Sequence, residues 1–371
     1  MVFLELRKGR DELIKETDIR AKAWRKSLKR TYHVKGSPRE VGFALGQALG
    51  ARLERNIARY IETGPARHGV IDRERLRNGA LPWLRGLPQR YQEEFEGLAE
   101  GANVPLQRLA EWCFVEECVQ DGCSAVVCLL EGRAWVARNN DLWAPDLWGY
   151  MTIREVDDRI PRIDFGLEGE LFTGTGINRE QLWLHYNWLP VVEQDAPTAG
   201  KPHMACFVWL TEALETCRTI DDVEALLRQV NRDGGMMLFV VEGKTDEFAV
   251  FECSCTTHRK REPVGNWIVG TNHTCTAGAP ELDDPQTASR RRFERIEELL
   301  QQFVGACGGG MDVSQALMGI LADPGVEVRG EDYGTVYASV TCPSQRMVWY
   351  TFGGYPAASS GAWYEIVWPW D

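Results

Sequence analysis

The chain has 371 residues, of which 44% are hydrophobic and 26% are charged. These are ordinary values for a globular protein with ample material for a core, and they exclude a disordered or fibrous chain. Forty-two Lys and Arg residues against 54 Asp and Glu residues give a net charge of −12, which argues against a nucleic-acid-binding surface.

The cysteines and the hydropathy pattern indicate a compartment. Eleven cysteines, an odd number without the regular spacing of a disulfide framework, are typical of free thiols in a reducing environment. The first residues, Met1 to Lys8, contain no apolar core long enough for a signal peptide, and no later stretch approaches a membrane span. We therefore expect a cytoplasmic protein that binds neither membranes nor nucleic acid.

The first 120 residues are predicted to be mainly helical. Ser37-Pro38-Arg39-Glu40 is a helix start, with Ser as the N-cap, Pro at the first position and Glu at the third. Apolar residues at helical spacing follow on one side of a single long helix: Val41, Leu45, Ala48, Leu49, Leu53, Ile57 and Ile61.

Glycines on that helix predict close packing. Gly42, Gly46 and Gly50 recur every four residues and would form a smooth face for a neighbouring helix. Further helices are expected at about 88–101 and 105–117.

The stretch from Gly122 to Asp141 predicts a β-hairpin. An apolar, β-branched run over 124–130 is followed by a tight turn at Glu131-Gly132 and a second strand over 133–139.

Beyond this hairpin, strands and helices alternate in groups. Strands are predicted at 151–156, 182–187, 237–241, 248–253, 267–271, 336–341, 347–352 and 363–368, and helices at about 205–217, 221–230, 287–304 and 313–322. Paired strands separated by helices indicate an α+β protein with mostly antiparallel sheets.

The Gly122-Cys123 peptide is the main candidate for chemistry. A cysteine thiol needs a base within hydrogen-bond reach, and a free α-amine, with a pKa of about 7.7–8.0, is one. If the chain cuts itself between these residues, the new N-terminal Cys123 supplies both nucleophile and base. Gly122 suits the scissile position because it lacks a Cβ and can adopt strained backbone angles.

Five local patterns, in order along the chain, resemble the acyl-coenzyme A:6-aminopenicillanic acid acyltransferase family. This family is a branch of the N-terminal-nucleophile hydrolases related to choloylglycine hydrolases. The patterns are Gly36-Ser-Pro-Arg-Glu-Val-Gly42 with Gly46; Glu96-Gly-Leu-Ala-Glu-Gly-Ala-Asn-Val-Pro105; Gly122-Cys123-Ser124 with Arg138-Asn-Asn-Asp141; Gly174-Thr-Gly-Ile-Asn178-Arg-Glu-Gln-Leu182; and Thr271-Asn272-His273 with Ser289 and Arg290.

The resemblance implies a four-layer αββα fold and self-cleavage into a helical segment, 1–122, and a catalytic domain, 123–371. Whether the short chain is released or retained stays open. By position, Cys123 matches the nucleophile, Asp141 the aspartate near its amine, and Asn272 a side-chain donor to the tetrahedral oxyanion. Arg138 matches an arginine beside the sulfur, and Asn178 a second polar donor.

The sequence departs from the family pattern at two places. Asn140 stands where an aromatic residue is common, and Arg179-Glu-Gln181 replaces a Glu-x-Gly pattern. A second arginine that the family uses further downstream has no clear counterpart.

The implied reaction cleaves or transfers an acyl group from a small-molecule amide or thioester and needs no metal and no cofactor. Trp143 and Trp148 are candidates to bound an apolar acyl pocket. The sequence does not choose between water and an amine as acceptor, nor between a monomer and a homo-oligomer.

Two other readings stay open. Cys123 and His273 could form an ordinary Cys-His pair in an uncut hydrolase, or the chain could be a non-catalytic relative that binds a ligand. Cys123 alone could be a buried structural thiol, Asp141 a turn cap, and Asn178 or Asn272 a turn residue.

Overall fold

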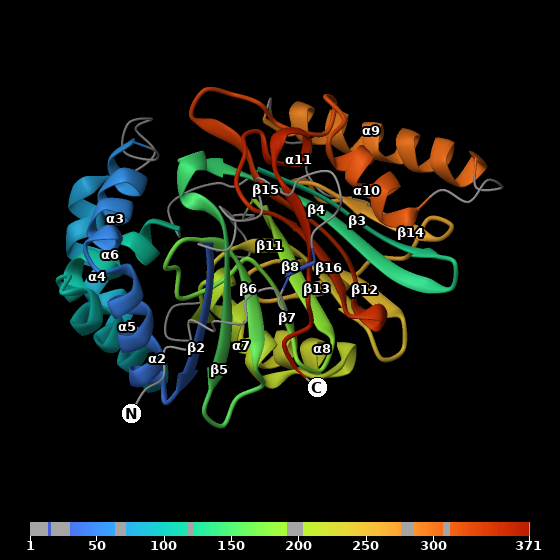
Figure 1. Ribbon diagram of the computed structural model, residues 1–371. Helices are drawn as coiled ribbons and strands as arrows, with labels where there is room; N and C mark the ends of the chain where they lie inside the picture. Colours follow the sequence, from blue (N-terminus) through green and yellow to red (C-terminus); the bar gives the residue numbers. More distant parts are fainter. Residues whose placement is uncertain are drawn as a thin grey trace.

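The structure, a computed structural model, describes residues 14–15, 30–63, 72–116, 122–190, 203–275, 285–306 and 312–370 (Figure 1). Two β-sheets lie face to face at its centre, and helices cover the outer face of each sheet. This αββα arrangement confirms the predicted fold class.

The first sheet has seven strands and is antiparallel throughout. Its helical cover consists of α9 (Pro285–Ala306), α10 (Val313–Leu321) and α11 (Ala357–Ser360), whose apolar side chains pack on one face of the central strands. The strand order is β1 (Ile14–Lys15), β17 (Trp363–Ile366), β16 (Met347–Thr351), β15 (Tyr333–Cys342), β4 (Arg133–Trp143), β3 (Gly122–Leu130) and β14 (Trp267–Gly270).

The second sheet has eight strands, and helices α7 (Cys206–Thr216) and α8 (Ile220–Gln229) cover its outer face. Strands β9 (His203–Met204) and β10 (Asn231–Arg232) form a separate parallel pair. The strand order is β13 (His258–Lys260), β12 (Glu247–Cys253), β11 (Gly235–Glu242), β8 (Leu182–Leu189), β7 (Thr175–Asn178), β6 (Arg162–Leu167), β5 (Trp148–Val156) and β2 (Thr31–Gly36).

The inner faces of the two sheets interlock closely. The rings of Phe165 on β6 and Tyr350 on β16 lie 4.8 Å apart. A Cβ on Gly270 of β14 would meet the side chains of Met237 and Phe239 on β11 at 2.2 and 2.6 Å, so a larger residue there would force both side chains to shift.

The N-terminal helices form a layer at one side of the sheets (Figure 1). They are α2 (Pro38–Leu49), α3 (Ala51–Thr63), α4 (Arg73–Gly86), α5 (Gln89–Ala102) and α6 (Leu106–Val115). The predicted capping box at Ser37 and Glu40 is present. The single long helix predicted from Pro38 is wrong, because Gly50 takes a φ of +52° and separates α2 from α3. Helix α4, which contains Pro82, was not predicted.

This N-terminal layer is not purely helical. Residues 31–36 form β2, which pairs in parallel with β5 at the edge of the eight-stranded sheet. The part of the chain before Cys123 is therefore built into the sheet of the part after it. No helix in the ranges given above combines the length and apolar character needed to cross a membrane.

Glycines bring α2 and α5 into backbone contact. A Cβ on Gly42 would lie 2.0 Å from the carbonyl oxygen of Glu94, and one on Gly97 would lie 2.1 Å from that of Arg39. Neither contact can be relieved by rotating a side chain, because both atoms belong to helical backbone. The smooth face predicted from the glycine spacing is used in this way by Gly42 and Gly46.

We predict that Gly97→Ala lowers the free energy of unfolding by about 2–3 kcal/mol, because the added methyl forces the two helices apart. The measurement is the urea unfolding midpoint of the variant against the wild type. Gly319→Ala is the matched control: Gly319 is exposed within α10, a Cβ there meets nothing within 4 Å, and the change should stabilise by about 0.5–1 kcal/mol. Equal effects at both sites would contradict the packing argument.

Candidate active site

The predicted hairpin is present and sets the register of the site. Strands β3 and β4 pair with Gly122 opposite Asp141 and Cys123 opposite Asn140. The turn residues Glu131 and Gly132 both have positive φ, 52° and 72°. A two-residue turn with positive φ at both positions has a backbone twist that matches the right-handed twist of the flanking strands.

Alternation along the hairpin sends neighbouring side chains to opposite faces. Arg138 donates to the Tyr186 carbonyl on β8 of the eight-stranded sheet, whereas the Asn139 amide donates to the Leu321 carbonyl on α10. Cys123 and Asn140 therefore share the inner face with Arg138, and Asp141 faces the helical layer.

The Cys123 sulfur lies against a fixed cation. Arg138 Nη2 is 3.3 Å from Cys123 Sγ, and Asn140 Oδ1 is 3.5 Å from the same sulfur. The guanidinium is held by Asn140 Oδ1 and the Tyr186 carbonyl, both at 2.8 Å, by the Gly174 carbonyl at 2.9 Å and by the Tyr337 hydroxyl at 3.2 Å.

This cation keeps its charge although it is buried. Burial opposes the charge of Arg138, but the Tyr337 hydroxyl and the Cys123 sulfur outweigh it and raise the pKa of the guanidinium. A permanent positive charge beside a thiol favours the thiolate, which is the nucleophilic form.

Strand β8 supplies carbonyls to the site because part of its edge is unpaired. β7 pairs with β8 only as far as Thr175, which lies opposite His185. The carbonyls of Tyr186 and Trp188 beyond this point accept from Arg138 and Asn272 instead.

The Cys123 nitrogen is held separately from its sulfur. It donates to Asn272 Oδ1 at 2.8 Å, and Arg292 Nη2 donates to the same oxygen at 2.9 Å. Asn272 Nδ2 donates to the Trp188 carbonyl at 3.1 Å. These partners orient the amide with its oxygen, not its N–H, toward Cys123. The expected oxyanion donor is thus placed as an acceptor for the residue-123 nitrogen.

Arg292 on α9 links two of the predicted site residues. Its Nη1 lies 2.7 Å from Asp141 Oδ2, and the Thr335 hydroxyl donates to Asp141 Oδ1 at 2.6 Å. Burial raises the pKa of Asp141, and Arg292 and Thr335 lower it in part. Sequence reasoning missed Arg292; the run Arg290-Arg291-Arg292 offered three candidates without a way to choose among them.

The structure gives a different reason for Gly122 than the one expected. Gly122 lies in β3 and is not among the residues with positive φ, so backbone strain does not explain it. Lack of space explains the glycine, because a Cβ on residue 122 would lie 2.3 Å from the Tyr333 hydroxyl oxygen and 3.1 Å from Asp141 Cβ.

Asn178 is not brought to the nucleophile by its amide group. Its Nδ2 donates to the carbonyls of Leu214 and Cys217, and its Oδ1 accepts from the backbone of Glu180 and Leu182. These contacts fasten the β7–β8 turn to the end of α7, so the structure offers no support for a donor role.

The two predicted pocket tryptophans lie beside tyrosines of β15. The Trp143 and Tyr333 rings are 5.0 Å apart, and those of Trp148 and Tyr337 are 5.9 Å apart. Trp148 Nε1 donates to the Trp143 carbonyl at 2.7 Å, which ties the two tryptophans together.

His273 is engaged away from the sulfur. Its Nδ1 lies 2.8 Å from Ser289 Oγ and 3.1 Å from Thr271 Oγ1, and its ring packs on Phe293. Burial lowers the pKa of His273 to about 4, with Arg290 and Arg261 adding to the effect. The imidazole is therefore neutral near pH 7.

No curated protein matches the sequence. Solved structures that are similar to this protein include a mutant of conjugated bile acid hydrolase from Clostridium perfringens. Its sequence identity is 13%, the match covers 62% of this chain and 89% of that chain, and the TM-score is 0.43. A second is an N-acylethanolamine-hydrolyzing acid amidase ortholog from Caenorhabditis elegans, with 13% identity, 60% of this chain and 93% of that chain covered, and a TM-score of 0.44. A third is penicillin V acylase from Agrobacterium tumefaciens, with 12% identity, 62% of this chain and 83% of that chain covered, and a TM-score of 0.42.

A family model gives the stronger result. Residues 129–355, more than half of the chain, match the model described as acyl-coenzyme A:6-aminopenicillanic acid acyl-transferase. The matched range includes Arg138, Asp141 and Asn272, and it begins six residues after Cys123. This match confirms the predicted resemblance to the acyltransferase family. The chain belongs to the acyl-coenzyme A:6-aminopenicillanic acid acyl-transferase family.

Proposed function

We propose that the protein cuts itself between Gly122 and Cys123 and then uses the N-terminal Cys123 to transfer or hydrolyse acyl groups. One observation carries the proposal. The two reactive atoms of a single residue have separate fixed partners: Arg138 lies 3.3 Å from the sulfur, and Asn272 Oδ1 lies 2.8 Å from the nitrogen.

The cut is an acyl shift from nitrogen to sulfur. The Cys123 sulfur attacks the Gly122 carbonyl carbon, the C–N bond breaks, and the thiol proton ends on the departing nitrogen. Water then hydrolyses the thioester, releases the Gly122 carboxylate and restores the thiol. Arg138 stabilises the sulfur anion that begins the attack, and Asn272 holds the nitrogen that leaves.

The mature enzyme repeats this attack on an external substrate. The neutral α-amine of Cys123 takes the thiol proton and returns it to the leaving amine or thiol of an amide or thioester. Water or an amine then removes the acyl group from the sulfur. Asp141 and Arg292 fix Asn272 and the edge of the hairpin during both steps.

An uncut Cys-His enzyme is the competing mechanism, and the geometry does not favour it. His273 Nδ1 is committed to Ser289 and Thr271, and the neutral ring packs on Phe293. We assign His273 to holding the start of α9 against the loop that carries Asn272.

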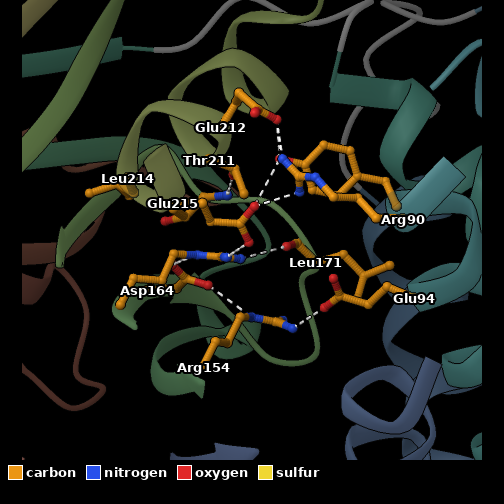
Figure 2. A network of polar contacts seen from close by, with 12 residues as sticks. Arg90, Glu94, Arg154, Asp164, Leu171, Thr211, Glu212, Leu214 and Glu215 are labelled. Atoms are coloured by element: carbon orange, nitrogen blue, oxygen red, sulfur yellow. Dashed lines mark hydrogen bonds and ion pairs between the residues drawn. The ribbon is translucent and has the colours of Figure 1, made fainter. Parts of the chain in front are cut away.

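We also propose that the two chains stay together after the cut. A buried network of ion pairs joins α5, which precedes Cys123, to β5, β6 and α7, which follow it (Figure 2). On α5, Glu94 pairs with Arg154, and Arg90 pairs with Glu212 and with Glu215, the latter at 2.5 Å.

The chain after Cys123 contributes further ion pairs that connect these residues to one another. Asp164 Oδ1 and Oδ2 each accept at 2.8 Å, from Arg162 and Arg154 respectively, and Arg162 also pairs with Glu215. The Arg154 and Arg162 side chains are 0% and 1% exposed. Separating the chains would break the pairs that Arg90 and Glu94 make with the chain after Cys123 and leave buried charge uncompensated, which opposes release of the N-terminal chain.

We predict that purified protein contains two chains, one of which begins Cys-Ser-Ala-Val. Intact mass and N-terminal sequencing measure this directly. Cys123→Ala should remain a single chain because no sulfur is available to attack Gly122. Cys128→Ala is the matched control, since Cys128 is buried on the same strand but faces α9 and α10, and it should be cut like the wild type. A single uncut wild-type chain with full activity would refute the proposal.

We predict that His273→Gln keeps self-cleavage and acyl transfer within about threefold of the wild type, whereas loss of a general base costs about 10²–10⁴-fold. Asn272→Ala provides the comparison and should slow cleavage far more, because it frees the Cys123 nitrogen. Because the pKa of His273 is about 4, its titration should leave the rate profile between pH 5.5 and pH 8 unchanged. A loss of more than 10²-fold on His273→Gln would favour the Cys-His mechanism.

We predict that Arg90→Met makes the N-terminal chain of cut protein separate at lower urea. The change leaves Glu212 and Glu215 facing each other and should cost about 2–3 kcal/mol. Arg39→Met should cost less than about 1 kcal/mol because the Arg39 side chain is 53% exposed in its pairs with Glu96 and Glu100. Size-exclusion chromatography across a urea series measures the separation, and equal midpoints for both variants would exclude the network as the link.

A further inference from the structure

Tyr333 is the side chain that limits residue 122 to glycine. Its hydroxyl oxygen lies 2.3 Å from the position that a Cβ on Gly122 would occupy. Tyr333 is the first residue of β15, where it pairs across the sheet with Trp143, and their rings meet edge to face at 5.0 Å. The hydroxyl therefore lies directly beside the α-carbon on the acyl side of the proposed scissile bond.

The opposite wall of this space is rigid. Asp141 Cβ and Oδ2 lie 3.1 and 3.3 Å from the same Cβ position. Asp141 is fully buried in the centre of the seven-stranded sheet and is held by Arg292 and Thr335. A substituent on the α-carbon would have to displace either this fixed carboxylate or the Tyr333 ring from its contact with Trp143.

We infer that Tyr333 is a specificity-determining residue that restricts the acyl group of substrates to those with an unbranched α-carbon, a CH₂ next to the carbonyl. The inference rests on the proposed function, since self-cleavage and external acyl transfer use the same sulfur and the same fixed partners. An acyl group attacked by Cys123 forms a thioester on the same sulfur as the Gly122 acyl group does during the cut. Its α-carbon then corresponds to Gly122 Cα, which lies between Tyr333 and Asp141.

Trp143 supports the Tyr333 side of this space. Its ring packs edge to face on Tyr333 at 5.0 Å and is itself buried, so Tyr333 cannot move away from the α-carbon in that direction. The substrate class that fits is an acyl group joined through a methylene to an amide or thioester carbonyl.

Self-cleavage tests the steric claim without any external substrate. Four full-length proteins are compared by intact mass during a time course after expression: wild type, Gly122→Ala, Gly122→Ala with Tyr333→Phe, and Gly122→Ala with Tyr355→Phe. Tyr333→Phe removes only the oxygen atom that meets the added methyl. We expect Gly122→Ala to slow the cut about tenfold or more and Tyr333→Phe to restore most of that loss.

Tyr355→Phe is the matched control. The Tyr355 hydroxyl lies over a different glycine, 2.5 Å from a Cβ on Gly334, and donates to the Gly330 carbonyl at 2.7 Å, so its removal should not rescue the cut. Cutting of Gly122→Ala at the wild-type rate would overturn the inference and leave the proposed function intact. Failure of Tyr333→Phe to rescue would overturn it equally, while an uncut wild type would refute the proposed function itself.

Acyl selectivity tests the substrate class in the processed enzyme. Butanoyl and 2-methylbutanoyl thioesters of the same thiol differ only in the methyl group on the α-carbon. We expect the wild type to prefer the butanoyl ester by about tenfold or more in kcat/KM, and Tyr333→Phe to reduce this ratio toward one. An unchanged ratio in the Tyr333→Phe enzyme, or the absence of a preference in the wild type, would contradict the assignment.

Discussion

The register of the β3–β4 hairpin is the constraint on which the site depends. With Gly122 opposite Asp141 and Cys123 opposite Asn140, the sulfur faces Arg138 on the inner face while Asp141 meets Arg292 on the outer face. A slip of one residue would exchange the faces of every side chain on one strand. The positive-φ turn at Glu131 and Gly132, with β14 and β15 on either side of the hairpin, prevents such a slip.

The part of the chain before Cys123 is bound to the rest by two unlike interactions. The α2–α5 glycine contacts stiffen the helical layer, and the Arg90–Glu94 face of α5 connects this layer to β5, β6 and α7 through ion pairs. Buried ion pairs give little net stability when they form, but breaking them is costly. Such a network is suited to an interface that must persist after a covalent connection is lost.

Much of the fold could be predicted from the sequence because hydrophobic periodicity and helix caps are local signals. The Ser37–Glu40 capping box, the hairpin turn and most strands after Cys123 followed from them. Strand β2 could not, because Thr31–Gly36 is short and takes its identity from pairing with β5, which lies 120 residues away. The break at Gly50 was hidden by an apolar stripe that continues through both α2 and α3.

The site was less predictable because its members meet through tertiary contacts. Cys123, Arg138 and Asp141 share one hairpin, so their proximity could be expected from the sequence. Arg292 and Tyr333 reach the site from α9 and β15, and no spacing rule singles them out. Asn140, noted only as a departure from the family pattern, turns out to hold both Arg138 and the sulfur.

The orientation of Asn272 has a chemical consequence that favours its contact with Cys123 in both chain states. Before a cut, the residue-123 nitrogen is an amide with one proton to donate, and Asn272 Oδ1 accepts it. After a cut, the neutral amine must keep its lone pair free to receive the thiol proton. A donor at this position would occupy that lone pair, whereas an acceptor engages an N–H and leaves it available. Arg292 and the Trp188 carbonyl orient the Asn272 amide with its oxygen toward the nitrogen. The proposed base therefore depends on these two groups as well as on the amine itself.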